Sequence, residues 1–213
     1  IAVETLYSMD GDRAPLDDLV ALAARHDAML VLDEAHATGV YGAQGKGLGA
    51  ALEGAANIIS LHTCGKALGA AGALVCLPRV LRDFLVNRAR GFIYSTAPSP
   101  LMAAVVRAAL RHAAGAAQER TQLQGLVRHA GAQLTKLGLP FSGSQIVPVV
   151  LGADARATAL AAALQARGHD VRAIRPPTVP ENTARLRIAL TLHVTPADLD
   201  ALFADLALEM EQA

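Results

Sequence analysis

Cysteine, net charge and long apolar runs are what this sequence lacks. Its two cysteines, Cys64 and Cys76, are too few for a disulfide framework or a structural zinc site, and their scarcity fits a reducing compartment. The 19 Lys and Arg residues equal the 19 Asp and Glu residues, and this balance argues against a nucleic-acid-binding surface, which needs clustered cations. Charges or glycines interrupt each apolar stretch before the ~20 residues that a membrane-spanning helix needs. We therefore expect a cytoplasmic protein that binds neither nucleic acid nor membrane.

The apolar content, by contrast, is high. Hydrophobic residues make up 53% of the 213 positions, enough to bury a sizeable core, which excludes wholesale disorder. The chain opens at Ile1, without Met, in what reads as a strand. We therefore expect a fragment of a longer protein, with the natural N-terminal part absent.

The first hundred residues alternate short apolar runs with helical and glycine-rich segments. A helix is expected to begin at Pro15, and a glycine-rich loop to cover 39–49. This alternation predicts an α/β protein with a mostly parallel sheet. The runs with the length and composition of buried strands are 1–9, 28–32, 58–61 and 73–77.

The second half of the chain has a different pattern. Residues 99–136 contain few helix breakers and predict one long helix, or two with a break near Gly115 or Gly125. Further strands are predicted at 146–151, 171–174 and 186–190, and further helices at 154–167 and from Pro196. The expected parts are a large domain over 1–97, a connecting helical region over 98–138 and a small α+β domain over 139–213.

The functional interpretation depends on Lys66, which lies between two glycines after a predicted strand. Lysines whose pKa is lowered by their surroundings form imines with carbonyl cofactors, although most lysines are solvated surface charges. Thr63, at the end of the strand, and Thr96, in a later turn, carry hydroxyls that suit a phosphate, unless they only cap helices. We expect Cys64, which is close to Lys66, to be an apolar filler.

An acid and a histidine follow an earlier predicted strand. Asp33 ends the run 28–32, and His36 comes three residues later. The carboxyl end of a parallel strand faces the crevice where α/β proteins bind ligands, and pyridoxal phosphate needs an anion at its ring nitrogen. A purely structural role, as a loop cap and a filler of a polar gap, is an equal alternative for this pair.

The same segment also matches another class of site. Asp33-Glu34-Ala35-His36 is the DEAH pattern of nucleotide hydrolases, in which a strand presents acids that bind Mg²⁺. That function needs an upstream G-x-x-x-x-G-K-[ST] loop, which the sequence lacks. The rival is weakened by this lack, although the absent N-terminal part could hold such a loop.

Three arginines near the C-terminal end differ in their expected roles. Arg175 precedes Pro176-Pro177, which would hold the backbone extended and fix the guanidinium for a carboxylate. Arg185 and Arg187 alternate along a predicted strand, which indicates an exposed face. Only Arg175 is therefore expected to bind a substrate.

Four motifs, in their order along the chain, resemble the α-oxoamine synthases, a family of pyridoxal-phosphate enzymes. The motifs are Ser8-Met9-Asp10-Gly11-Asp12, Asp33-Glu34-Ala35-His36-Ala37-Thr38-Gly39, Thr63-Cys64-Gly65-Lys66-Ala67-Leu68-Gly69 and Tyr94-Ser95-Thr96. The resemblance covers nearly the whole chain. It implies the aspartate-aminotransferase-like fold (PLP fold type I), here as part of the large sheet domain followed by the small C-terminal domain.

The resemblance implies a cofactor, pyridoxal 5′-phosphate, and a role for each residue that would touch it. Lys66 would hold the cofactor covalently as an imine and later move the substrate α-proton. Asp33 would pair with the ring nitrogen, while His36 and Ser8 would contact the ring and its oxygen. Thr63 would bind the phosphate. No metal ligand is implied.

The remaining implied contacts concern the second subunit and the substrates. Thr96 would reach the phosphate in the neighbouring subunit of a homodimer with a shared active site. Arg175 would hold the amino-acid carboxylate, with Thr178 in the same pocket. The stretch 173–180 resembles the family member that condenses L-alanine with pimeloyl-CoA or a pimeloyl carrier protein and releases CO₂. Relatives that use glycine with other acyl-CoA thioesters remain alternatives, as does an inert partner subunit, and the fragment alone is not expected to catalyse.

Overall fold

The computed structural model describes residues 1–212, which form two units, each with its own sheet. Unit 1 comprises Ile1–Tyr7 and Arg13–Arg120, and unit 2 comprises Ser8–Asp12 and the chain from Thr121 onwards. The short segment Ser8–Asp12 therefore belongs with residues that lie far along the chain. None of the described helices is long and apolar enough to span a membrane.

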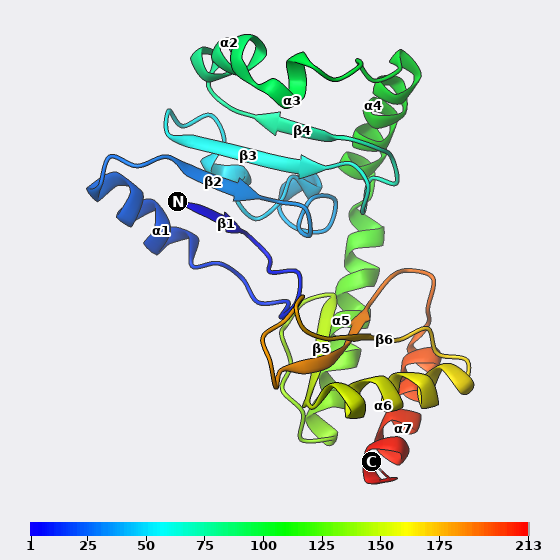
Figure 1. Cartoon of the computed structure of the whole chain (residues 1–213). Helices are drawn as coiled ribbons and strands as arrows, with labels where there is room; N and C mark the ends of the chain where they lie inside the picture. The colour runs from blue at the N-terminus through cyan, green and yellow to red at the C-terminus, as the bar shows by residue number, and fades with distance from the viewer. Residues whose placement is uncertain (213) are drawn as a thin grey trace. The chain divides into compact units, whose positions relative to one another are not determined.

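Unit 1 is built on a four-stranded sheet with the order β1-β2-β3-β4 (Figure 1). The first three strands are parallel and the last is antiparallel to β3, which confirms the predicted α/β class with a mostly parallel sheet. The run predicted as a strand over 1–9 is shorter than expected. The strands are β1 (Ala2–Glu4), β2 (Leu30–Asp33), β3 (Ile58–Thr63) and β4 (Ala73–Cys76).

Helix α1 (Leu16–Arg25) begins directly after Pro15, as predicted. Its fully buried Ala23 packs in one cluster with Leu30 and Leu32 of β2 and Ile58 of β3. The glycine-rich loop predicted over 39–49 lies between β2 and β3. This part of the chain contains only two short 3-10 turns, η1 (Ala43–Gly45) and η2 (Ala50–Leu52).

The helices that follow β4 were only partly predicted. No helix was expected at α2 (Arg79–Arg88) or α3 (Arg90–Ile93), whose described residues include none that are buried. The predicted break near Gly115 is confirmed, because α4 (Pro100–Gly115) ends there and α5 (Ala117–Lys136) begins after one residue.

Unit 2 contains an antiparallel sheet in the order β5-β7-β6. Buried residues of α6, such as Leu160 and Leu164, and of α7, such as Leu206, contribute to its core, and Thr195 caps α7 as predicted through a hydrogen bond with Asp198. The elements are β5 (Ile146–Gly152), α6 (Asp154–Ala166), β6 (Arg172–Ile174), β7 (Ala184–Ala189) and α7 (Pro196–Gln212).

Candidate functional site

The candidate site lies where β2 and β3 end. Because these two strands are parallel, the loops that follow them leave the same edge of the sheet. Lys66, after β3, places its Nζ 2.8 Å from Nε2 of His36, after β2. A lysine ammonium only donates hydrogen bonds, so this contact requires a lone pair on Nε2 of a neutral His36 ring, with the proton on Nδ1. The structure thus joins two residues that the sequence analysis named separately.

The turn that carries Lys66 is tight, as predicted. The backbone N–H of Gly69 donates to the carbonyl of Lys66 at 2.9 Å, and that of Ala70 donates to the carbonyl of Cys64 at 2.8 Å. Cys64 is buried in an apolar cluster with Leu68 and other residues, which confirms that it is a filler. The result is an exposed lysine on a turn that is anchored by a buried side chain.

Asp33 is the last residue of β2 and is half-buried. Its Oδ1 accepts the backbone N–H of Ala35 at 2.8 Å, which fixes the carboxylate at the strand end. Among the residues that the structure describes, no basic side chain is paired with Asp33. Its other oxygen is therefore available to a cationic partner such as a protonated ring nitrogen.

Glu34, the next residue, has a different environment. It is 1% exposed, and its carboxylate accepts the hydroxyl of Thr5 at 2.8 Å and the backbone N–H groups of Leu48 and Gly49. A Cβ on Gly47 would overlap Glu34 Oε2, so the glycine-rich loop can close over this carboxylate only without a side chain there. Because the fold already occupies both oxygens, Glu34 is unsuited to the Mg²⁺-binding role of the DEAH pattern.

The other predicted site residues fall in both units. In unit 1, Thr63 is half-buried at the end of β3 and Thr96 is exposed between α3 and α4. In unit 2, Ser8 accepts a hydrogen bond from Arg187 Nε through its carbonyl at 2.7 Å, and Thr178 is exposed. The roles of these residues toward a cofactor or substrate remain predictions.

The arginines of unit 2 require two corrections. The prediction that Arg185 and Arg187 form an exposed face is wrong, because Arg185 is 5% exposed and forms an ion pair with Asp10, and Arg187 is half-buried. The prediction of an extended stretch after Arg175 is also wrong. The Pro176-Pro177 bond is cis, and the N–H of Thr178 donates to the carbonyl of Arg175 at 3.0 Å, so a turn follows the exposed Arg175.

The sequence analysis missed a group of metal-binding residue types in unit 1, namely Glu53, His62 and Cys76. The two-residue alternation of β3 and β4 could have placed His62 and Cys76 on one face of a sheet. No local signal places Glu53, because it comes from the loop after η2.

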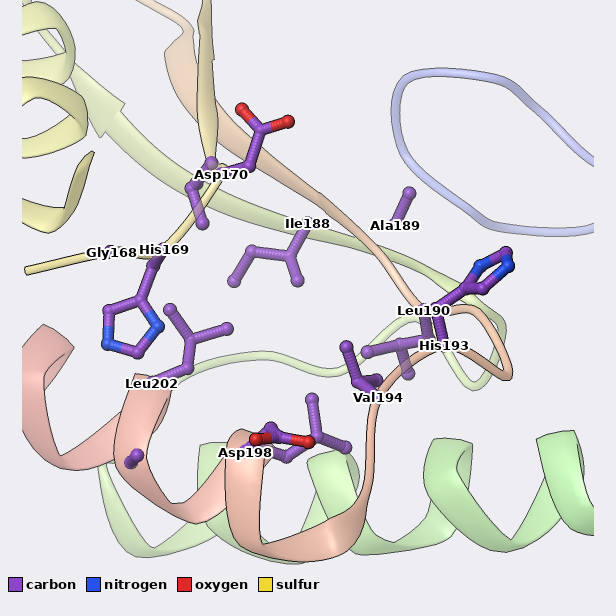
Figure 2. A pocket seen from close by; sticks show the side chains of 13 residues that line it. Gly168, His169, Asp170, Ile188, Ala189, Leu190, His193, Val194, Asp198 and Leu202 are labelled. Atoms are coloured by element: carbon purple, nitrogen blue, oxygen red, sulfur yellow. The ribbon is translucent and has the colours of Figure 1, made fainter.

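A cavity of about 460 Å³ in unit 2 lies among the loop that precedes β6, the end of β7 and the first turns of α7. Figure 2 shows His169 pointing toward α7, where its Nε2 lies 2.8 Å from Asp205 Oδ2. The backbone N–H and the hydroxyl of Thr195 donate to Asp198, which lowers the pKa of that carboxyl. The acid groups near this cavity thus have local structural partners, and the strand-end site of unit 1 is the better candidate.

This fold, with a lysine after a parallel strand and an acid at the end of the neighbouring strand, is that of an aminotransferase-like protein. Residues 1–206 match the sequence model of the family described as aminotransferase class I and II, and the chain belongs to that family. The resemblance stated from the motifs, and the expected PLP fold type I, are confirmed.

Three similar proteins, one matched by sequence and two by structure, narrow the comparison within this family. The 8-amino-7-oxononanoate synthase of Anaeromyxobacter dehalogenans is 49% identical over 211 residues, which are 97% of this chain and 53% of that protein. The solved 8-amino-7-oxononanoate synthase of Francisella tularensis has a TM-score of 0.87 at 26% identity, covering 100% of this chain and 63% of its own. A structure of SPT, serine palmitoyltransferase, with its PLP internal aldimine has a TM-score of 0.90 at 28% identity, covering 99% of this chain and 54% of its own. The chain spans about half the length of the curated relatives.

Proposed function

We propose that the full-length protein is a pyridoxal-phosphate-dependent acyltransferase that condenses L-alanine with a pimeloyl thioester to 8-amino-7-oxononanoate, a step of biotin biosynthesis. The observation that carries this proposal is the contact between Lys66 and His36 beside Asp33, at the edge where β2 and β3 end. The 49% identity to an 8-amino-7-oxononanoate synthase supports the choice of substrates.

The residues at this edge suit pyridoxal phosphate. An exposed amine at Lys66 can hold the carbonyl carbon of the cofactor, and the carboxylate of Asp33 has an oxygen for the protonated ring nitrogen. His36 would lie against the ring, and Thr63 offers a hydroxyl for the phosphate. The bound cofactor supplies an electron sink for a carbanion at the substrate α-carbon.

The chain's own residues would then move a proton and bind the amino acid. Nζ of Lys66 would take the α-proton and return it, and His36, 2.8 Å away, would orient this amine. The guanidinium of Arg175 would bind the carboxylate of L-alanine, with Thr178 beside it. The exposed position of Arg175 on a turn supports this role, because its side chain can accept an external ligand.

A homodimer with shared active sites is part of the proposal. Thr96 lies in a segment with exposed apolar side chains, including Tyr94 at 78% and Leu101 at 71% exposure. Such a patch is typical of an interaction surface, and a second copy would cover it and place Thr96 near the partner's cofactor phosphate. An exclusively monomeric full-length protein in size-exclusion chromatography would contradict this part.

The test of the proposal is chemical labelling combined with product analysis. The chain has three lysines, Lys46, Lys66 and Lys136. Borohydride treatment of the full-length protein with pyridoxal phosphate should label Lys66. With L-alanine and pimeloyl-CoA, Lys66→Ala should lower product formation by ~10⁴-fold or more, because the proton-transferring amine is removed.

The matched control is Lys136→Ala in unit 2, which should keep wild-type turnover. A label on Lys46 or Lys136, or turnover by Lys66→Ala, would contradict the assignment. Product from glycine and acetyl- or succinyl-CoA, without product from alanine and pimeloyl-CoA, would leave the reaction class intact and change the substrates.

A further inference from the structure

A second constellation in unit 1 has no part in the proposed reaction. Oε1 of Glu53, the ring nitrogens of His62 and Sγ of Cys76 offer ligand atoms that all lie within 4.8 Å of one another. Nε2 of His62 is 2.7 Å from Oε1 of Glu53. We propose that these three side chains form a site for a divalent transition metal, with Zn²⁺ as the preferred ion.

The sheet explains how two of the ligands meet. β3 and β4 are antiparallel, with His62 opposite Leu74 and Ser60 opposite Cys76. Since residues two apart share a face, His62 and Cys76 are diagonal neighbours on one face of the sheet. Glu53 reaches them from the loop after η2, so a bound metal would tie this loop to both strands.

The hydrogen bonds of His62 leave the correct nitrogen for a metal. The single hydroxyl proton of Thr38 donates to the carbonyl of Glu34 at 2.8 Å, so Thr38 Oγ1 accepts from Nδ1–H of His62, also at 2.8 Å. A histidine ligand characteristically donates one ring N–H to a fixed partner and binds metal through the other nitrogen. That other nitrogen, Nε2, is the one that faces Glu53.

The donor set and the surroundings select the metal. One sulfur, one nitrogen and one carboxylate oxygen are ligands of Zn²⁺, whereas Mg²⁺ and Ca²⁺ prefer oxygen alone. The ligand atoms of tetrahedral zinc lie ~3.5 Å apart, and the candidate ligand atoms here all lie within 4.8 Å of one another. Two cysteines exclude a zinc site built from cysteines alone, but this mixed set uses only Cys76.

The three side chains also have room beside them for an ion and access to solvent. Glu53, His62 and Cys76 all line one cavity of about 330 Å³, together with Lys46, and Cys76 is exposed. The hydroxyl of Ser60, buried on the same face as Cys76, has no hydrogen-bond partner among the described residues. A tetrahedral ion with three protein ligands keeps a fourth position for water, for which this cavity has room. Metal binding would release to solvent the thiol proton of Cys76 and the proton that His62 Nε2 and Glu53 Oε1 share at 2.7 Å.

The experiment uses the full-length protein stripped of metal and titrated with Co²⁺, followed by Zn²⁺. We expect one Co²⁺ per chain, a thiolate-to-cobalt charge-transfer band, and loss of that band as Zn²⁺ displaces the cobalt. Cys76→Ser should abolish the band and weaken Zn²⁺ binding by at least ~100-fold, and His62→Gln should weaken it similarly. The thermal midpoint of metal-free Cys76→Ser should match that of the metal-free wild type, which separates lost binding from lost folding.

The matched controls are Cys64→Ala, which removes the other thiol, and His26→Gln, which removes an exposed histidine after α1. Both should retain the band and the affinity. Absence of the band in the wild type, or its persistence in Cys76→Ser, would overturn the proposal. Because the readout is metal binding alone, its outcome is independent of whether the protein acylates alanine.

Discussion

Each unit contains charged residues that look alike in the sequence and differ in the structure. At the end of β2, Asp33 is half-buried and keeps one oxygen available, whereas its neighbour Glu34 is 1% exposed and accepts three hydrogen bonds. In unit 2, Arg175 is exposed on a turn, whereas Arg185 is buried against Asp10. In both units one charge is already satisfied by the fold, and the other can receive a ligand.

The difference lies in where the partners come from. Glu34 is satisfied by Thr5 and by the backbone of the glycine-rich loop, and Arg185 by Asp10 and the carbonyl of Thr183. A buried charge is tolerated only with such partners, because its desolvation is otherwise uncompensated. Substitutions of the buried residues should therefore change stability, and substitutions of the available residues should change activity.

The largest expected effect is that of Asp33→Asn on catalysis. The asparagine keeps the shape and the hydrogen bond to Ala35 but removes the negative charge that would keep the cofactor ring nitrogen protonated. Product formation should fall at least ~10³-fold, about 4 kcal/mol of transition-state stabilisation, while the urea midpoint stays near the wild-type value. Near-native turnover would make Asp33 a structural residue.

Glu34→Gln should show the opposite behaviour. An amide has only one acceptor oxygen, so its NH₂ group would face an N–H donor from Leu48 or Gly49 in a buried site. The free energy of unfolding, measured by urea denaturation, should fall by about 2–3 kcal/mol. Turnover per folded molecule should be unchanged. If activity fell and stability did not, the distinction between the two acids at this strand end would be lost.

The sequence predicted those features that depend on residues close together in the chain or on the residue spacing of a helix or strand. Apart from the run 1–9, of which only Ala2–Glu4 form a strand, the apolar runs predicted each strand to within about two residues. The parallel-strand rule placed Asp33 and His36 at the ligand-binding edge, and only the structure brings Lys66, 30 residues further on, to His36. Helix α2 was missed although Val80, Leu81, Phe84 and Leu85 recur at helical spacing, and α3, with four residues, is too short to show a period.

The burial of Arg185 and the position of Glu53 depend on contacts between distant parts of the chain, which no local sequence pattern predicts. The alternation of Arg185 and Arg187 indicated an exposed face, but the acid that lets Arg185 be buried is 175 residues away. Likewise, Glu53 reaches His62 and Cys76 only through the path of a loop. Such pairs require the tertiary structure, because side-chain types alone do not say which charges the fold has satisfied.

The smallest expected effect is that of Asp10→Asn on the stability of unit 2. Arg185 is buried, whereas 60% of the Asp10 side chain is exposed, so solvent screens part of the pair. The asparagine still accepts a hydrogen bond but leaves a buried guanidinium without its counter-charge. We expect a loss of about 1–2 kcal/mol in the free energy of unfolding, below the 3–5 kcal/mol of a fully buried pair.

The matched control is Asp12→Asn, at an exposed position of the same segment, which should change the free energy of unfolding by less than about 0.5 kcal/mol. Equal effects of the two variants would show that the ion pair does not stabilise Arg185 in its buried position.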